Sequence, residues 1–270
     1  WKQTGGFVDN ETANKNRTLY SSTAITVTAK VTVTGETEPT DPDLLADFTF
    51  DDGGKTFDGG NATGTTQGTA TLADGKDGKA AKLSKNFWLN VTAKNGDALL
   101  KGKNDVTISY DVKPDASNNT GWTFFAASNA TKQEYGKEHY VGVLDKTTGI
   151  TVERYNNNDG KRDSSGNVSY TKTNADWKHV DIVISGATAK LYIDSKLVAV
   201  NNNGQKLADI LGADGGVLQI GKANWSNGEY FSGLLDNFKI WGKALSDDEL
   251  GVESARTDYA AALAIPAQIG

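Results

Sequence analysis

The sequence DIVISGATAKLYIDSKLVAV runs from Asp181 to Val200, and LQIGKANWSNGEYFSGLLDNFKIWGKALSDDEL runs from Leu218 to Leu250. In the first stretch, two short runs of alternating apolar and polar residues meet at a tight turn. In the second, a Gly-rich connection leads into a long alternating run. Side chains of a β-strand point alternately to opposite faces, so this alternation predicts half-buried strands. Successive strands joined by turns and polar loops predict a β-sandwich.

The order of these parts resembles the laminin G-like, concanavalin A-type jelly rolls that accompany secreted bacterial glycosidases. Three features carry the resemblance: the hairpin Tyr192 to Leu197, the Trp177 that opens a central strand, and the ending GKALSDDEL after the last strand. The resemblance extends from about Leu44 to Leu250. It implies an all-β fold, a two-sheet antiparallel β-sandwich of the concanavalin A-like jelly-roll type with one short C-terminal helix. It also implies carbohydrate recognition rather than catalysis.

Further strands are predicted by alternation and by β-branched or aromatic residues. Phe48 and Phe50 share one face of the first of them. The predicted strands are 46–50, 81–83, 87–91, 106–112, 122–127, 139–144, 150–155, 178–185, 190–193, 196–200, 217–220 and 231–241. Trp88 and Trp241 lie in strongly apolar strands and are expected in the core, and Trp177 and His179 are interpreted as packing residues.

Two local signals concern the ends of strands. Ser246 and Glu249 form a capping box, which predicts a short helix after the last strand. At the hairpin, relatives usually have Asp-Gly, because a type I′ turn needs positive φ at both central residues. Here Ser195 replaces the glycine. We therefore expect a different turn or a longer loop.

The chain divides into four predicted segments. Residues 1–35 end in an alternating run and resemble the close of an upstream immunoglobulin-like module. Residues 36–43, rich in proline and carboxylates, form a linker. The jelly roll occupies 44–251, and 252–270 form a C-terminal linker and the start of a following module. The alternative is that both tails pack on the central domain.

Composition excludes several classes of function. The net charge is −6 with an isoelectric point near 5.0, and no basic cluster is interleaved with aromatics, which argues against nucleic acid as a partner. Apolar runs fall far short of the roughly 20 residues that a bilayer span needs, so no membrane insertion is expected. Cysteine is absent, which removes disulfides and thiolate chemistry. We expect an extracellular, secreted or cell-surface bacterial protein that is monomeric.

Motifs of catalysis are missing from the sequence. It contains neither G-x-S-x-G nor H-E-x-x-H nor a phosphate-binding G-x-x-x-x-G-K-[ST] loop. Glycosidases on related jelly rolls use closely spaced carboxylates on one strand, because the nucleophile and the acid must flank the bond about 5 Å apart. No E-x-D-x-E triplet is present. The domain itself is predicted not to be an enzyme, although carboxylates brought together by folding are an alternative.

Asp236 is the most informative carboxylate. It alternates with Phe238 and Ile240, which places it on the core side of the last strand, where a bare charge is costly. It therefore needs either a polar network or a metal ion. The family resemblance implies structural calcium, a cation that prefers oxygen ligands. The matching positions are Asp51 and Asp236, with carbonyls of the Gly-rich loop between them, and Asp58 is a weaker candidate.

Candidate sugar-binding residues lie where strands become loops. Aromatic faces suit the apolar side of a sugar ring, and planar polar groups suit its hydroxyls. Trp225 leads, because polar and Gly residues flank it and predict an exposed loop. The full set is Trp225, Arg154, Tyr155, Trp122, His139, Tyr135 and Tyr230. For each ring taken singly, packing in the core or over a sheet is the alternative.

These residues favour a non-catalytic carbohydrate-binding module that targets a parent extracellular glycosidase to plant or host glycans. The expected partners are an oligo- or polysaccharide and the adjacent domains of the same polypeptide. The alternatives are a structural spacer between modules and an adhesion domain that binds a protein surface. Exposed aromatics beside Arg154 or His139 would favour sugar binding, whereas a large flat apolar patch would favour adhesion.

Overall fold

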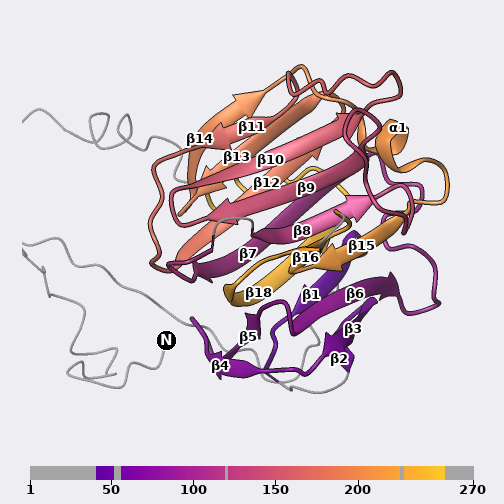
Figure 1. The fold of residues 1–270 in the computed structure, drawn as a ribbon. Coiled ribbons are helices and arrows are strands. Elements are labelled where there is room, and N and C mark those ends of the chain that lie inside the picture. Colours follow the sequence, from indigo (N-terminus) through magenta and orange to yellow (C-terminus); the bar gives the residue numbers. More distant parts are fainter. Residues whose placement is uncertain (1–40, 52–55, 119–120, 226–227, 253–270) are drawn as a thin grey trace, which may run out of the picture. The chain divides into compact units, whose positions relative to one another are not determined.

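The computed structural model describes residues 41–51, 56–118, 121–225 and 228–252, which form two antiparallel sheets packed face to face (Figure 1). The first sheet has the order β14 (Lys196–Asn201), β13 (Thr188–Ile193), β12 (Lys178–Ser185), β7 (Asp105–Pro114), β18 (Gly233–Trp241), β5 (Lys79–Leu83) and β4 (Leu72–Asp74), and β1 (Leu44–Phe48) also pairs with β18. The second has the order β11 (Val168–Tyr170), β10 (Gly149–Asn156), β9 (His139–Lys146), β8 (Trp122–Ala127), β15 (Val217–Ile220), β6 (Phe87–Ala93), β3 (Ala62–Gly68) and β2 (Thr56–Gly59). A separate two-stranded hairpin joins β16 (Lys222–Ala223) to β17 (Glu229–Tyr230). The predicted two-sheet jelly roll is confirmed.

The core lies between the two sheets and is filled by alternate residues of both. At one end, the rings of Phe48, Phe50, Phe57 and Phe87 contact one another in sequence, with centroids 5.5 to 6.1 Å apart. These buried rings hold β1, β2 and β6 together, because aromatic side chains remove the largest apolar area from water.

The last strand, β18, organises the first sheet. One edge pairs with β7 along most of its length, and the other pairs first with β5 and then with β1. The change of partner coincides with a bulge between Asp236 and Lys239, where Asn237 adopts a positive φ of 48°. A bulge leaves backbone groups unpaired and bends the strand.

Asp236 compensates for this break in the ladder. The bulge corrects its predicted place on the core side, because Asp236 pairs with Asp111 and so lies on the other face of the sheet from Leu235, Phe238 and Ile240. Its side chain is fully buried, and Oδ2 accepts the backbone N–H groups of Lys76 and Asp77 at 2.8 and 3.1 Å. Oδ1 accepts the N–H of Asn237 at 2.8 Å. The carboxylate thus joins β18 to the turn between β4 and β5 and satisfies three amides that the bulge and turn leave free.

The hairpin between β13 and β14 corrects one prediction. The turn has two residues, and both Asp194 and Ser195 adopt positive φ, 49° and 60°, so the type I′ turn forms without glycine. The backbone N–H of His179 donates to Asp194 Oδ1 at 2.9 Å, and Asp194 N–H donates to the carbonyl of His179 at 2.9 Å. These two bonds hold Asp194 in a conformation that Asp tolerates better than most residues.

The predicted C-terminal helix is wrong. The capping box forms, because Ser246 N–H donates to Glu249 Oε2 at 2.8 Å and Glu249 N–H donates to Ser246 Oγ at 3.3 Å. Residues 247–251 nevertheless make only turns, and Gly251 has a positive φ of 62°. The helix that the structure describes is α1 (Leu207–Leu211), which connects β14 to β15 and is too short to cross a membrane.

Strands with few apolar residues escaped prediction. Besides the predicted runs, the structure contains β2, β3, β4, β11, β16 and β17. β3 reads ATGTTQG, in which Thr and Gly give little hydrophobic alternation. The predicted immunoglobulin-like segment 1–35 and all of the C-terminal segment after residue 252 lie outside the described residues.

Asp236→Asn should lower the free energy of unfolding by about 2 to 4 kcal/mol, because an asparagine carbonyl replaces one charged acceptor and its NH₂ group faces amide donors. Urea denaturation with a constant m-value measures this loss. Asp77→Asn is the matched control on the same turn, where the side chain is exposed, and should stay within about 0.5 kcal/mol of the parent. Equal effects of the two substitutions would contradict the role given to Asp236.

Candidate functional site

The outer face of the second sheet carries an aromatic cluster over β8, β9 and β10. It comprises Trp122, Phe125, Tyr140 and Tyr155, with Trp225 packed against it. The Tyr140 ring lies 4.7 Å from Phe125 and 5.9 Å from Trp225, the latter edge to face. Large apolar side chains on an outward face need a cover or a ligand.

A β-bulge places Trp122 in this cluster. Strict alternation would put Trp122 on the same face as Phe124, which is in the core. The pairing of β8 with β9 shifts register between these two residues, so Trp122 instead joins Phe125 on the outer face. Gly142 of β9 makes room for the ring, since a Cβ at that position would collide with it. Bulges often re-aim a side chain beside a functional site.

Above the cluster lies an open cleft with a volume of about 280 Å³, here called the aromatic cleft. Trp122, Trp225 and Tyr135 supply its aromatic surface, and Tyr135 is 71% exposed. Its remaining lining residues are Leu144, Lys146, Glu153, Arg162 and Glu229. Aromatic faces, two carboxylates and two cations therefore share one surface of the sheet.

Arg162 is the central cation of the cleft. Its guanidinium lies 4.4 Å from the ring centroid of Tyr155, 5.8 Å from that of Trp225 and 5.9 Å from that of Tyr135. It also donates to Glu153 Oε2 at 3.1 Å. Burial disfavours its charge, but the neighbouring Tyr140 and Glu153 outweigh burial and raise the pKa of Arg162. Arg162 is fully charged and holds the aromatic rings in place.

The two carboxylates of the cleft are already hydrogen-bonded. Tyr140 Oη donates to Glu153 Oε2 at 2.5 Å, and Trp122 Nε1 donates to Glu229 Oε2 at 2.6 Å. Burial raises the pKa of Glu153, whereas the bond from Tyr140 and the charge of Arg162 act in the opposite direction. Each carboxylate retains acceptor capacity that sugar hydroxyls can use.

Two loops hold Tyr135 and Arg162 beside each other. Gly160 N–H donates to the carbonyl of Gly136 at 3.0 Å, and a Cβ on Gly136 would collide with the Gly160 backbone. Buried Glu138 accepts from Asn157 Nδ2 at 2.8 Å and lies 3.5 Å from Arg162 Nε. The site is therefore largely preformed, which reduces the entropy lost on binding.

Three of the seven predicted sugar-binding residues, Trp122, Tyr135 and Trp225, line the cleft. Tyr155 is buried beneath Arg162. His139 is half-buried, and its Nδ1 lies 2.8 Å from Asn156 Oδ1. Tyr230 is half-buried in β17 and pairs with Lys222. Neither His139 nor Tyr230 lines the cleft.

Arg154 has a structural environment instead. It is 1% exposed, and its guanidinium donates to the backbone carbonyls of Gly166, Ala187 and Asn201 at 2.9 to 3.4 Å. Burial lowers its pKa to about 10. Arg154 therefore joins two loops to the end of β14, on the side of β10 opposite to Tyr155.

Sequence reasoning missed Glu153, Arg162 and Glu229. Alternation offered a signal for the first, because Glu153 shares a face with Tyr155 whereas Arg154 does not. Glu229 directly precedes the candidate Tyr230. Arg162 lies in the polar loop after β10, and its position depends on contacts between the two loops.

The family model described as the concanavalin A-like lectin/glucanases superfamily, Laminin_G_3, matches residues 90–251, more than half of the chain. The chain belongs to this superfamily. The match includes every residue that lines the aromatic cleft. No curated protein matches the sequence.

Solved structures of similar fold include an arabinanase domain and neurotoxin binding domains. Domain 4 of AbnA, a GH43 extracellular arabinanase from Geobacillus stearothermophilus solved with arabinotriose, has a TM-score of 0.58 and 22% identity, over 77% of this chain and 96% of that one. The binding domain of botulinum neurotoxin serotype C1 has a TM-score of 0.55 and 13% identity. The neurotoxin DC binding domain in complex with SialylT has a TM-score of 0.53 and 12% identity. Both neurotoxin matches cover 78% of this chain and about half of the other, and at these identities the likeness shows the fold.

Of the three predicted calcium ligands, two lie at one turn and the third, Asp58, lies elsewhere. Asp51 and Asp236 lie against the same turn between β4 and β5. Asp51 Oδ1 accepts the N–H of Lys79 at 2.7 Å, and a Cβ on Gly75 or Gly78 would collide with Asp236 or Asp51. Carboxylate oxygens are the ligand type that calcium prefers, but the described residues contain no cluster of three or more His, Cys, Asp or Glu side chains that could hold a metal ion. Asp58 instead accepts from Gly60 N–H at 3.0 Å and pairs with Lys94 at 3.1 Å.

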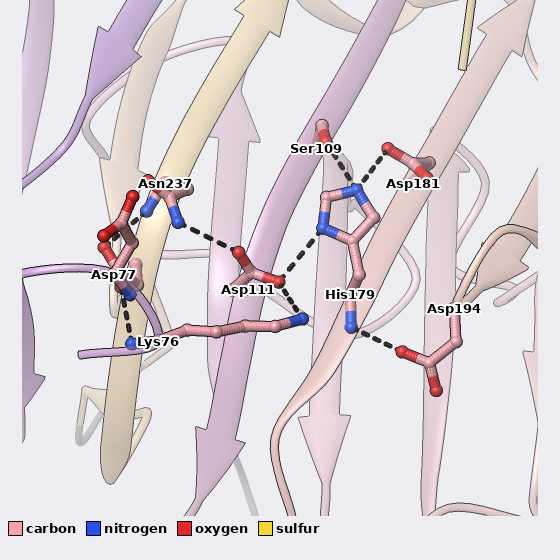
Figure 2. A network of polar contacts seen from close by, with 9 residues as sticks. Lys76, Asp77, Ser109, Asp111, His179, Asp181, Asp194 and Asn237 are labelled. Atoms are coloured by element: carbon pink, nitrogen blue, oxygen red, sulfur yellow. Dashed lines mark hydrogen bonds and ion pairs between the residues drawn. The ribbon is translucent and has the colours of Figure 1, made fainter. Parts of the chain in front are cut away.

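A charged network occupies the outer face of the other sheet, beside the β18 bulge (Figure 2). Its members are Lys76, Ser109, Asp111, His179, Asp181 and Asn237. His179 was interpreted as a packing residue, but its Nδ1 lies 3.1 Å from Asp111 Oδ1 and its Nε2 lies 3.2 Å from Asp181 Oδ1. Lys76 Nζ and Asn237 Nδ2 also donate to Asp111, at 2.9 and 3.0 Å.

Two tryptophans also differ from their prediction. Trp88 and Trp241, both expected in the core, are half-buried.

The network shifts two pKa values in opposite directions. Hydrogen bonds to Asp111 and Asp181 raise the pKa of His179 to about 9, against the effect of burial. Burial alone would raise the pKa of Asp111, but hydrogen bonds from His179, Asn237 and Lys76 lower it to about 2. At neutral pH the imidazolium therefore bridges two carboxylates.

The stability that His179 contributes should depend on pH. A raised folded-state pKa means that the contribution is complete below the unfolded value of about 6.5 and is lost as pH rises through about 9. We expect His179→Gln to lower the free energy of unfolding by about 1 to 2 kcal/mol at pH 6, allowing for partial exposure, and by much less at pH 9.5. Urea denaturation of the parent and of His179→Gln across this pH range measures the difference between their free energies of unfolding. Groups that titrate alike in both proteins do not contribute to this difference. A difference that does not change with pH would contradict the charged bridge.

Proposed function

We propose that this domain binds carbohydrate in the aromatic cleft and does not cleave it. The observation that carries the proposal is the gathering of Trp122, Tyr135 and Trp225 around Arg162 and two glutamates on one face of the sheet. Aromatic faces can stack on sugar rings, and the charged groups can pair with hydroxyls. Solved structures of the same fold include an arabinanase domain bound to arabinotriose and a neurotoxin domain bound to SialylT, which supports a sugar ligand.

The non-catalytic part of the proposal is supported by the partners of the two glutamates. Glu153 is held by Tyr140 and Arg162, and Glu229 by Trp122. A glycosidase needs one carboxylic acid free to protonate the leaving oxygen and a second carboxylate that acts as nucleophile or base. In this cleft both groups serve better as fixed acceptors.

We further propose the setting of this activity. The domain is a monomeric module of an extracellular protein, joined to neighbouring domains, and targets a parent glycosidase to plant or host glycans. The arabinanase neighbour is a domain of an extracellular GH43 enzyme, which supports this setting. An adhesion domain would present a large flat apolar patch, whereas the exposed large hydrophobic residues in the described part of the chain are Tyr135, Leu197 and Val200.

A glycan array tests the sugar proposal. The domain, displayed multivalently because shallow sites bind weakly, should bind one class of glycan in calcium-containing buffer. Trp225→Ala should weaken binding at least about tenfold, equivalent to about 1.4 kcal/mol. Trp241→Ala is the matched control, since that tryptophan is also half-buried but lies on the other sheet, and it should bind as the parent does. A blank array from folded protein would favour the spacer alternative.

We also propose that a calcium ion binds at Asp51 and Asp236, where it would supply the positive charge that neutralises both carboxylates. Calcium should then raise the melting temperature relative to a chelator, because a ligand at about 100 times its dissociation constant stabilises by about 2.7 kcal/mol. Asp51→Asn should abolish the shift, and Asp58→Asn should retain it. The absence of any shift in the parent protein would contradict a calcium site.

A further inference from the structure

A second cavity opens on the same face of the sheet as the aromatic cleft. It has a volume of about 480 Å³ and lies over β6 and β15, next to β8. Its polar lining residues are Asn90, Thr92, Gln219, Lys222 and Asn224, and no carboxylate is among its lining residues. We call it the amide cleft.

Strand register places the two clefts along one line. Glu153, Gly142, Phe125, Gln219 and Asn90 are successive cross-strand partners from β10 to β6, strands that lie side by side in Figure 1. Residues directly opposite one another share a face of the sheet. Four strand spacings of about 4.8 Å give about 19 Å from one end of this row to the other.

The two clefts adjoin at the hairpin of β16 and β17. Asn224 lines the amide cleft, and the next residue, Trp225, lines the aromatic cleft. The carbonyl of Asn224 accepts Gln133 N–H at 2.9 Å, which fixes the hairpin to the loop that carries Tyr135. An extended ligand that stacks on Trp225 could therefore continue directly into the second cavity.

The amide cleft contains an unsatisfied polar group. Gln219 is 7% exposed, and its Nε2 donates to Asn90 Oδ1 at 3.2 Å. Its Oε1 is buried and has no hydrogen-bond partner in the described structure. A buried carbonyl without a donor is unfavourable. Because Gln219 lines the cleft, a rotation of its carboxamide that presents Oε1 to a sugar hydroxyl would favour binding. Lys222, whose Nζ lies 4.3 Å from the Trp88 ring centroid, adds a cationic donor at the edge.

We propose that the amide cleft is a second subsite for the carbohydrate chain held in the aromatic cleft. The ligand is then an extended, hydroxyl-rich oligosaccharide that crosses the strands from β10 to β6. This inference rests on the proposed function, because the first subsite is the aromatic cleft. The aromatic cleft supplies stacking and carboxylate acceptors, and the amide cleft supplies carboxamides and an ammonium group.

The test is isothermal titration calorimetry with a size series of linear arabino-oligosaccharides, from the trisaccharide to the octasaccharide. If the array identifies another glycan class, the same series of that class is used. The octasaccharide should bind the parent protein at least about tenfold more tightly than the trisaccharide. Gln219→Leu should remove most of this advantage and leave the trisaccharide affinity unchanged. Lys222→Ala, at a half-buried position, should reduce it and covers the case in which Gln219→Leu does not fold.

Control variants separate the two proposals. Gln67→Ala, on the same face of β3 but outside the cavity, should behave as the parent does. Trp225→Ala should weaken the binding of both the trisaccharide and the octasaccharide. Equal affinity of the parent for both sugars, or an octasaccharide advantage that survives both amide-cleft substitutions, would overturn the second subsite while leaving the proposed function intact. Failure of the parent to bind any oligosaccharide would instead overturn the proposed function.

Discussion

The fold depends on one break in one strand. β18 can have three partners only because its outer edge changes from β5 to β1 at the Asp236–Asn237 bulge. A bulge in a central strand would normally leave buried amides unpaired. The Asp236 carboxylate meets this requirement from within the strand, and Asn237 extends outward to Asp111. Asp236 pairs with Asp111 on the face that carries the charge network. The buried carboxylate and the network therefore belong to the same irregularity, joined by Lys76 of the neighbouring turn.

The candidate site uses the same device on the other sheet. The β8 bulge turns Trp122 away from the core, and Gly142 accepts its ring. In both sheets a shift of register by one residue moves a side chain, Trp122 or Asp236, to the face opposite to the one that regular pairing would give it. The strands on either side stay paired, so these side chains are held by rigid elements. Loops supply the remaining groups, Tyr135 and Arg162, and are pinned to each other by backbone contacts.

Alternation in the sequence was sufficient to predict the sandwich and most of its long strands, because period two reports directly which residues face the core. It could not locate bulges, so nothing in the sequence predicted that Trp122 and Phe124 lie on opposite faces of the sheet. It also could have separated Arg154 from Tyr155, which as neighbours in a strand must face opposite ways. Arg162 depends on two loops that meet only in the folded chain. The turn at Asp194 formed without glycine because tertiary hydrogen bonds to His179 outweighed the local preference.

The pairing of β1 with β18 determines how the domain would respond to tension along the polypeptide. Leu44 opens β1 opposite Trp241, which closes β18, and Gly242 N–H donates to the carbonyl of Asp43 at 2.8 Å. The chain thus enters and leaves the sandwich at the same point. In an antiparallel pair the hydrogen bonds are perpendicular to the strands. A pull on both ends therefore loads these bonds one after another, and they break in sequence from that end of the pair. We therefore expect the domain to unfold at a low pulling force and to resist tension poorly.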